Sequence, residues 1–172
     1  MEIHFKLSLL LFIIILIFFQ SCNNPFAPAE AGPNASASNL LTDQKTPDEV
    51  LTNFKFAYTF KDSLVYSALF DSSFIFLSED FDQVPPVPIQ WGRDLELKTT
   101  ARMFKFFNTL DLTFNVIDDT TNNEGDPLYR ITFTLTLDGG ATIPTLNGEV
   151  EFTYVKNKEG KYLISKWKDL QI

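Results

Sequence analysis

The 172-residue sequence contains one histidine, His4, and one cysteine, Cys22, and both lie near the N-terminus. The rest of the chain therefore offers neither an imidazole nor a thiol. Their absence excludes a Ser-His-Asp triad, a Cys-His nucleophile pair, and zinc or copper sites built from His and Cys. A single cysteine also excludes a disulfide within the chain. We expect neither a metal ion nor a cofactor.

Positive charge is scarce as well. The chain has 14 Lys and Arg against 22 Asp and Glu, which gives a formal net charge of −8. Nucleic-acid binding needs clustered cations that neutralise phosphates, so we expect no nucleic-acid partner. Anionic lipid headgroups are disfavoured for the same reason. The simplest interpretation of the acidity is solubility.

The N-terminus has the pattern of a secretory leader. Leu7–Phe19 is almost entirely apolar, and Ser21 precedes Cys22. As a helix this stretch would span ~20 Å, less than the ~30 Å hydrocarbon core of a bilayer, which favours a cleaved signal peptide over a membrane-spanning helix. A small residue followed by cysteine resembles the lipobox of bacterial lipoproteins, although Gln20 is untypical there. The resemblance implies that residues 1–21 are removed and that Cys22 carries the lipid.

This resemblance also implies a location. The mature protein is expected to be exported and anchored in the bacterial cell envelope by acyl chains such as palmitate, in the outer membrane if there are two membranes. The segment 22–45 would then be the lipidated cysteine and a flexible tether, because prolines are spaced among Ala, Ser and Asn without apolar periodicity. The folded domain is expected to cover residues 46–172.

The domain is expected to begin with a helix. Thr46 is a good N-cap, Pro47 fits the first helical position, and Glu49 stands where a capping box requires it. The apolar residues that follow recur on one helical face: Val50, Leu51, Phe54 and Tyr58.

Two more helices are expected. Asp62 is the predicted N-cap of a second helix, which ends near Asp71. A third is predicted to start at Trp91 and to end at Asn108. Its apolar residues lie on or beside one face: Leu97, Ala101, Met103, Phe104, Phe106 and Phe107.

Strands follow and complete an α+β plan. Phe74–Leu77 predicts a short buried strand, whereas Val84–Pro88 predicts a loop because its prolines cannot pair inside a sheet. From Leu110 onward, apolar residues alternate with polar ones in four further segments. These predict an antiparallel meander with strands near residues 110–116, 129–137, 150–154 and 163–167.

This order resembles the nuclear-transport-factor-like superfamily, whose cystatin-like, cone-shaped domains include the SnoaL-like proteins. It looks most like the poorly characterised bacterial lipoproteins of that fold. The residues that carry the resemblance are Phe54, Ala57, Asp62, Tyr66, Phe74, Phe76, Trp91, Glu96, Met103, Phe104 and Tyr162–Asp169.

The resemblance implies N-terminal helices packed on a strongly curved antiparallel sheet, with a cone mouth that often holds a small apolar ligand. Members include isomerases, dehydratases, cyclases and binding modules. Ketosteroid isomerases of the superfamily use an Asp base with a Tyr and a protonated Asp. None of those three residues can be placed on this chain by motif.

Asp62 and Tyr66 form the one candidate catalytic pair. They lie four residues apart on a predicted helix, so both could project from one face. The alternative is that Asp62 only caps the helix while Tyr66 buries its ring and bonds its hydroxyl to the backbone.

Trp91, Trp167 and Asp80 are the candidate pocket residues. An indole offers apolar area with one donor, and a carboxylate of raised pKa is typical of functional clefts. Core packing of both tryptophans and a solvated loop at Glu79–Asp82 are the alternatives.

The remaining candidates are weaker. Asp118–Asp126 is rich in oxygen ligands, but Gly125 is misplaced for a calcium loop. Arg102 and Arg130 could balance an anionic ligand, or they could lie at the surface or in salt bridges.

Three functions fit this sequence. The leading hypothesis is a non-catalytic, membrane-anchored module that binds a small apolar molecule or another envelope protein. The second is a cone-fold enzyme that uses carboxylate and tyrosine acid–base chemistry. The third is an interaction module whose cone is filled by its own phenylalanines, because most of the 18 in the chain fall in the predicted domain. A homodimer is compatible with all three.

Overall fold

The computed structural model describes residues 40–80, 82–138 and 145–170. These residues belong to one compact unit, Ala37–Ile172. The predicted signal peptide, Cys22 and most of the predicted tether lie outside the described residues.

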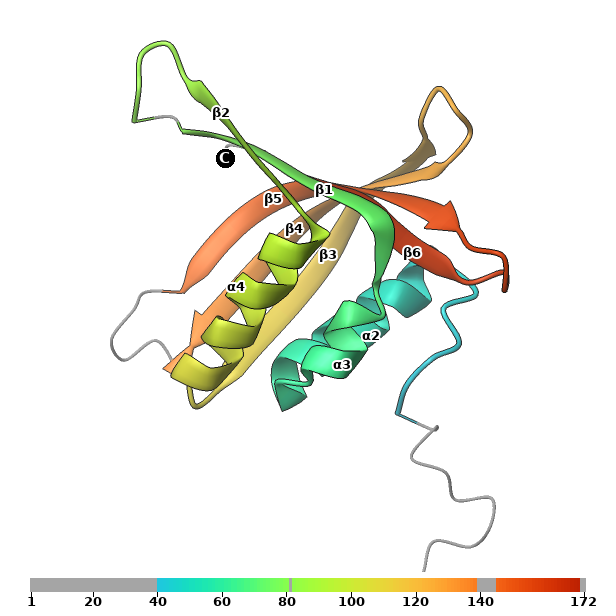
Figure 1. The fold of residues 1–172 in the computed structure, drawn as a ribbon, viewed down its shortest axis with the longest axis horizontal. Helices are drawn as coiled ribbons and strands as arrows, with labels where there is room; N and C mark the ends of the chain where they lie inside the picture. The colour runs from blue at the N-terminus through green and yellow to red at the C-terminus, as the bar shows by residue number, and fades with distance from the viewer. Residues whose placement is uncertain (1–39, 81, 139–144, 171–172) are drawn as a thin grey trace, which may run out of the picture. The chain divides into compact units, whose positions relative to one another are not determined.

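The described chain forms three helices and six strands (Figure 1). In chain order they are α2 Pro47–Phe60, α3 Ser63–Ser67, β1 Phe70–Asp80, β2 Val87–Gly92, α4 Arg93–Phe106, β3 Leu110–Thr121, β4 Pro127–Leu137, β5 Leu146–Lys156 and β6 Tyr162–Leu170. The strands form one sheet in the order β2-β1-β6-β5-β4-β3. All neighbours are antiparallel except β1 and β6, which are parallel.

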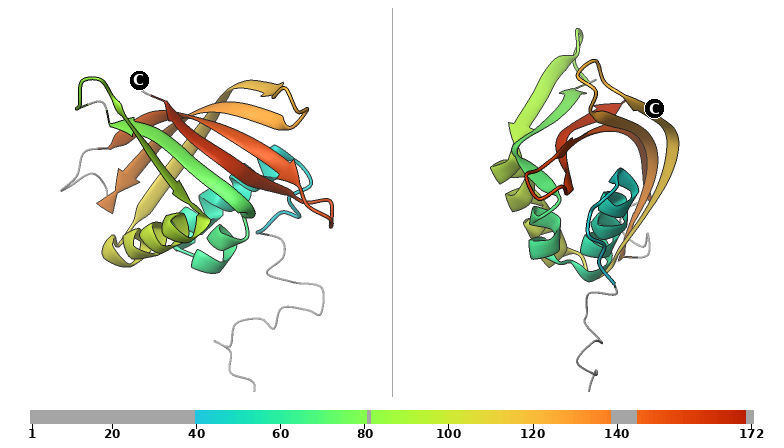
Figure 2. Two further views of the ribbon diagram at one scale, coloured as in Figure 1. Left: turned by 45° about the horizontal axis from the view of Figure 1, so that its top comes forward. Right: turned by 90° about the vertical axis from the view of Figure 1, so that its right-hand side faces the viewer.

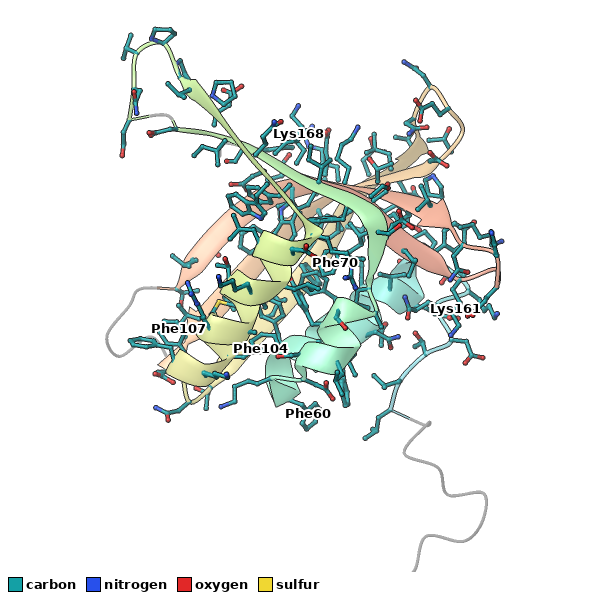
Figure 3. The ribbon with its side chains drawn as sticks, in the orientation of Figure 1. Phe60, Phe70, Phe104, Phe107, Lys161 and Lys168 are labelled. Atoms are coloured by element: carbon teal, nitrogen blue, oxygen red, sulfur yellow. The ribbon has the colours of Figure 1, made fainter. Side chains whose placement is uncertain are left out.

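The sheet curves around the helices, as Figure 2 shows from two further sides. This arrangement confirms the expected α+β class with helices packed on a curved sheet. The aromatic side chains between the two layers fill the space (Figure 3). The ring of Phe54 lies at its centre, with six aromatic ring centroids 5.2 to 6.2 Å away: Tyr58, Tyr66, Phe70, Phe114, Phe152 and Trp167.

Helix α2 begins where the sequence predicts. The Thr46 hydroxyl oxygen accepts a hydrogen bond from the Glu49 N–H at 3.3 Å. The Glu49 carboxylate accepts one from the Lys45 N–H at 2.7 Å, so the capping box closes one residue earlier than usual. The helix ends at Lys61 in the left-handed region, with φ 53°.

The folded domain begins before Thr46, earlier than we expected. The Thr42 N–H donates to the Asn53 side-chain oxygen at 2.8 Å. Gln44 is only 7% exposed, and its side chain donates to the Tyr162 carbonyl at 3.0 Å. The Tyr162 N–H donates in turn to the Gln44 carbonyl at 2.7 Å. The segment 42–45 is therefore bonded to the domain and does not belong to a free tether.

The other two helices are shorter than expected. Helix α3 ends at Ser67, because the chain enters β1 at Phe70. Helix α4 starts at Arg93, so Trp91 lies in strand β2 and not in the helix. Phe107 takes the C-cap position that we expected for Asn108. Phe106, expected beside the apolar face, is 77% exposed.

Strand β1 extends beyond the expected segment Phe74–Leu77, and strand β2 forms where no strand was expected. Val87 and Pro88, expected in a loop, open strand β2, and Pro88 pairs with Glu79. Because β2 is the edge of the sheet, its outer side needs no donor, and a proline is tolerated there.

The four C-terminal strands confirm the predicted alternation, with two local differences. Strand β3 continues to Thr121, so Asp118 and Asp119 lie in a strand and the loop is reduced to 122–126. In β6, Ile164 and Trp167 both contact the core although they are three residues apart. A β-bulge explains this, since the register passes from Tyr154↔Ile164 to Thr153↔Lys166 and leaves Ser165 unpaired.

Candidate functional site

The structure places Asp62 and Tyr66 in separate environments. The Asp62 carboxylate accepts hydrogen bonds from the Leu64 and Val65 N–H groups at 2.9 and 3.0 Å, as an N-cap does. The Tyr66 side chain is 1% exposed, and its hydroxyl donates to the Glu96 carboxylate at 2.7 Å. The two groups do not converge on a common point, and the partner of Tyr66 is a carboxylate and not the backbone.

Glu96 is the centre of a buried polar network. Its Oε1 accepts from the Tyr66 hydroxyl and from the Thr100 hydroxyl at 3.0 Å, and its Oε2 accepts from the Trp91 indole N–H at 2.8 Å. The side chain is 6% exposed. Three donors from α3, β2 and α4 therefore converge on one carboxylate, and buried polar groups that are satisfied in this way fix the elements that carry them.

Burial also determines what the tyrosines of this network can do. Burial raises the pKa of Tyr66 well above its usual value, and the neighbouring Tyr58 and Glu96 add to the shift. Burial likewise raises the pKa of Tyr58, with a further contribution from the Glu96 carboxylate. Both phenols stay protonated at neutral pH, so they serve as hydrogen-bond donors and not as bases.

Trp91 and Trp167 belong to the core. The Trp91 ring stacks on Phe76 with centroids 3.8 Å apart, and Trp167 approaches the same Phe76 at 5.6 Å. Among the described residues, the buried Trp167 indole N–H has no hydrogen-bond partner. Phe76 thus brings the two predicted tryptophans together, within the packed aromatic layer.

Asp80 lies apart from the tryptophans, at the last position of β1. Its carboxylate accepts from the Asp82 N–H at 3.2 Å and from the Gln83 side chain at 2.9 Å, so it stabilises the turn that follows. Glu79 is also in the strand, whereas we expected both residues to follow the strand end.

A groove of about 380 Å³ lies at the ends of β1, β2 and β6. Leu77, Pro88, Ile89 and Leu170 give it an apolar lining, and it also contains polar groups. The polar residues are Ser78, Glu79, Gln90, Lys168 and Asp169. Its size and mixed lining fit a small-molecule site.

Asp169 is a carboxyl group of this groove whose pKa is shifted by its surroundings. Its carboxylate accepts a hydrogen bond from the Ser78 hydroxyl at 3.2 Å. Partial burial raises the pKa of Asp169 above its usual value, and the Ser78 hydrogen bond offsets part of this shift. A carboxyl group of raised pKa in a groove is a recognised sign of a functional position.

Sequence reasoning missed the roles of Glu96 and Asp169, although both left a signal. Glu96, Thr100 and Phe104 recur every four residues and form the buried face of α4. Asp169 lies two residues after Trp167, so strand alternation puts both on the same face of β6. Each carboxylate was therefore predictable as an inward-facing residue.

The two arginines and the acidic loop have structural explanations. Arg130 forms a salt bridge with Glu149 on the neighbouring strand, and Arg102 is exposed on α4. The Asn122 side chain accepts from the Glu124 and Asp126 N–H groups at 2.9 Å, which closes the turn after β3.

No group of three metal-ligating side chains comes together in ranges 40–80, 82–138 and 145–170. Over the same part of the chain, no helix has the length and apolar character needed to cross a bilayer.

Comparisons with known proteins identify the fold. No protein-family model matches the sequence. No characterised protein matches it either. Solved structures do match, at identities low enough that they show the fold alone.

Three of these structures are representative. A "Putative Scytalone Dehydratase" from Novosphingobium aromaticivorans matches with a TM-score of 0.57 and 16% identity, over 72% of this chain and 81% of that one. An NTF-2 like protein of unknown function from Shewanella oneidensis gives 0.54 and 12%, over 71% and 93%. A cystatin-like domain of unknown function from Nostoc punctiforme gives 0.54 and 12%, over 72% and 73%. The domain therefore has the nuclear-transport-factor-like, cystatin-like cone fold.

Proposed function

We propose that this chain is a membrane-anchored lipoprotein whose domain is a non-catalytic binding module, and that the groove between β1, β2 and β6 takes a small apolar molecule with one polar end. The observation that carries the proposal is the groove itself, with an apolar lining and the Asp169 carboxylate beside Ser78. An apolar ligand would gain from burial against Ile89, which pairs with Ser78 and so lies on the same face of the sheet, and a donor group on the ligand would bond to Asp169.

The packed interior argues for binding without catalysis. The predicted acid–base pair is already used, because Asp62 caps α3 and the Tyr66 hydroxyl is bonded to Glu96. The aromatic rings around Phe54 fill the space between the helices and the sheet. The groove lies at the end of the strands, beyond the layer formed by Phe76 and Trp91.

A second candidate, an enzyme, is favoured by one observation. The raised pKa of Asp169 would allow this carboxyl group to exchange a proton with a ligand in the groove. The fold is shared with a protein named as a putative dehydratase, which supports the class of reaction only by analogy. In this case Asp169→Asn would abolish turnover while leaving ligand binding nearly intact.

The groove is tested with a neutral apolar fluorophore such as Nile red. Ile89→Trp fills the groove, so we expect saturable dye binding to weaken by about tenfold or more, which corresponds to ~1.4 kcal/mol. Val84→Trp is the matched control, because Val84 belongs to the same hairpin but does not line the groove and is 98% exposed. Equal binding by the two variants would show that the groove is not the site.

The anchor is tested by fractionation of cells that express Cys22→Ser. Acyl chains contribute ~0.8 kcal/mol per buried CH₂, so their loss should release the protein from membranes or leave the precursor uncut. A variant that is cleaved and still membrane-bound would contradict the lipoprotein assignment. Capture of an envelope protein by the anchored chain, with the groove variant unaffected, would favour a protein partner over a small ligand.

A further inference from the structure

Three large apolar side chains are exposed at one end of the helical layer. Phe60 is 62% exposed, Leu64 82% and Phe106 77%. Half-buried neighbours extend this surface, since Phe56 contacts Phe60 with ring centroids 4.5 Å apart and Phe107 contacts Phe106 at 4.9 Å. These five residues are called the aromatic end below. Exposed apolar groups gathered in this way mark a surface that is covered in use.

A cross-helix contact holds the aromatic end together. The Lys61 ammonium group donates to the Phe107 and Asn108 carbonyls at 3.3 and 2.9 Å. The C-terminal ends of α2 and α4 are therefore neighbours, and α3 with Leu64 follows directly after α2. Figure 3 shows Phe60 at the end of the helices that is remote from the sheet, and Phe107 at the end of α4.

The charges at this end differ from those of the whole chain. Lys105 is exposed on the last turn of α4, and Lys55 is exposed on α2 five residues before Phe60, whereas the acidic residues of α2 lie in its first turn. Two carboxylates near this end accept hydrogen bonds from the backbone. Asp62 caps α3, and Asp138 accepts from the Asn108 and Thr109 N–H groups at 2.7 and 2.9 Å.

The described residues that precede α2 run toward the same end. Lys45 is bonded to Glu49, and Thr42 is bonded to Asn53 one helical turn further along α2. The path from Lys45 back to Thr42 therefore runs along α2 in the direction of Phe60. Residues 23–39 separate the described chain from Cys22, and a chain of this length reaches at most ~60 Å.

We propose that the aromatic end is a second membrane contact, which rests on the bilayer to which Cys22 is anchored. This inference depends on the lipid anchor of the proposed function. Phe60, Leu64 and Phe106 would enter the interfacial layer of zwitterionic lipids, while Lys55 and Lys105 stay among the headgroups. The anchor keeps the domain at a high effective concentration near the bilayer, so a weak contact is enough.

This contact would orient the groove. In the three views of Figures 1 and 2, the β1–β2 hairpin and the end of β6 lie on the opposite side of the domain from the ends of α2 and α4. With the aromatic end on the membrane, the groove faces the aqueous phase and stays open to a ligand.

The test uses the lipidated mature chain in phosphatidylcholine vesicles. Lys105→Cys introduces a thiol beside Phe106 for an environment-sensitive dye, and Lys158→Cys does the same on the exposed turn between β5 and β6. We expect spin-labelled lipids to quench the dye at position 105 and to leave the dye at 158 unquenched. Equal quenching at both positions, or none at 105, would overturn the proposal.

Variants identify the groups responsible. The triple variant Phe60→Ser, Leu64→Ser and Phe106→Ser should reduce quenching at position 105 to the level at 158. The matched control Val84→Ser and Ile117→Ser removes apolar side chains that are 98% and 52% exposed elsewhere and should change nothing. Quenching that survives the triple variant would contradict a membrane contact through these residues. Dye signals that depend on protein concentration without vesicles would also contradict it, because they would indicate that a second copy of the chain covers the aromatic end.

Failure of the anchor is recognised separately. An unlipidated Cys22 would react with the dye, so two labels per chain instead of one would show that the lipid is missing. In that case the anchor assignment fails, and vesicle-dependent quenching of a Cys22→Ser, Lys105→Cys chain, which takes a single dye, decides whether the aromatic end binds lipid.

Discussion

A single carboxylate, Glu96, links three elements that are distant in the sequence. Its partners are Tyr66 in α3, Trp91 in β2 and Thr100 in α4, and every one of them donates. Both terminal atoms of this side chain must therefore accept hydrogen bonds. Among the twenty side chains, only those of Glu and Asp have two such acceptors. Glu96 acts as a structural residue that fixes α4 against the rest of the domain.

Glu96→Gln tests this role with little change in shape. The amide has one oxygen, so its NH₂ group must face either the Trp91 indole N–H, which cannot accept, or the Tyr66 and Thr100 hydroxyls, which then lose the acceptor for their protons. We expect the free energy of unfolding to fall by about 1–3 kcal/mol, the cost of a buried donor left without an acceptor. Urea denaturation measures the loss. Asp94→Asn on the exposed side of the same helix is the control, and a Glu96→Gln variant as stable as that control would contradict the network.

Asp169 predicts a dependence of stability on pH. Its pKa in the folded state lies above the ordinary value of 3.8, so the folded protein retains the proton at pH values where the unfolded chain has lost it. Stability from this group is complete below the unfolded pKa and is lost as the pH rises through the folded pKa. Asp169→Asn removes the titration. We expect the variant to melt above the wild type at about pH 7 and at the same temperature near pH 3.5. A constant difference over this range would be incompatible with the assignment.

Whether the partner of a site residue could be predicted from the sequence depends on how far apart the two residues lie along the chain. The cap at Asp62 was predictable, because a cap depends on neighbours two and three residues away. The partner of Tyr66 was not, because Glu96 lies 30 residues further along the chain and only the fold brings them together. Asp169 accepts from the Ser78 hydroxyl but lies 91 residues further along the chain, so this contact was not predictable for the same reason.

At the scale of elements, long periodic segments were predictable and their ends were not. The alternation in β4 and the apolar stripe of α2 depend on many residues, so they tolerate single exceptions. The start of α4 depended on Trp91, which fits a strand or a helix, and the structure assigns it to β2 because it stacks on Phe76. Pro88 led us to predict a loop, because the sequence did not show that β2 would be an edge strand, where a proline is tolerated.

Strands β4 and β5 meet at a pair that leaves no room for a side chain. Phe133 lies opposite Gly148, and a methyl group added at Gly148 would overlap the Phe133 ring. We expect Gly148→Ala to lower the free energy of unfolding by about 1–3 kcal/mol, as overpacking does. In the Phe133→Leu background the same change should cost clearly less, because the ring edge is gone. Denaturant titration of the four proteins measures the coupling, and additive effects would show that the ring is not the obstacle.

At the scale of the whole molecule, the class of fold followed from the order of elements, and the filling of the cone followed from the number of phenylalanines. The groove did not follow, because it arises where β1, β2 and β6 end together and those ends were the least predictable part. The domain start was placed late for a related reason. Residues 42–45 have no periodic pattern of their own and are ordered by partners elsewhere in the chain.

Two truncations locate the true start of the domain. A chain that begins at Leu40 keeps the bonds of Thr42 to Asn53 and of Gln44 to Tyr162, so its free energy of unfolding should lie within about 0.5 kcal/mol of the full mature chain. A chain that begins at Thr46 loses these hydrogen bonds, at about 1 kcal/mol each, and leaves the nearly buried Asn53 amide unpaired. We therefore expect it to be less stable by about 2–4 kcal/mol. Urea denaturation of the two chains side by side measures the difference. Equal stabilities would mean that the segment only rests on the surface and that the domain begins at the Thr46 cap.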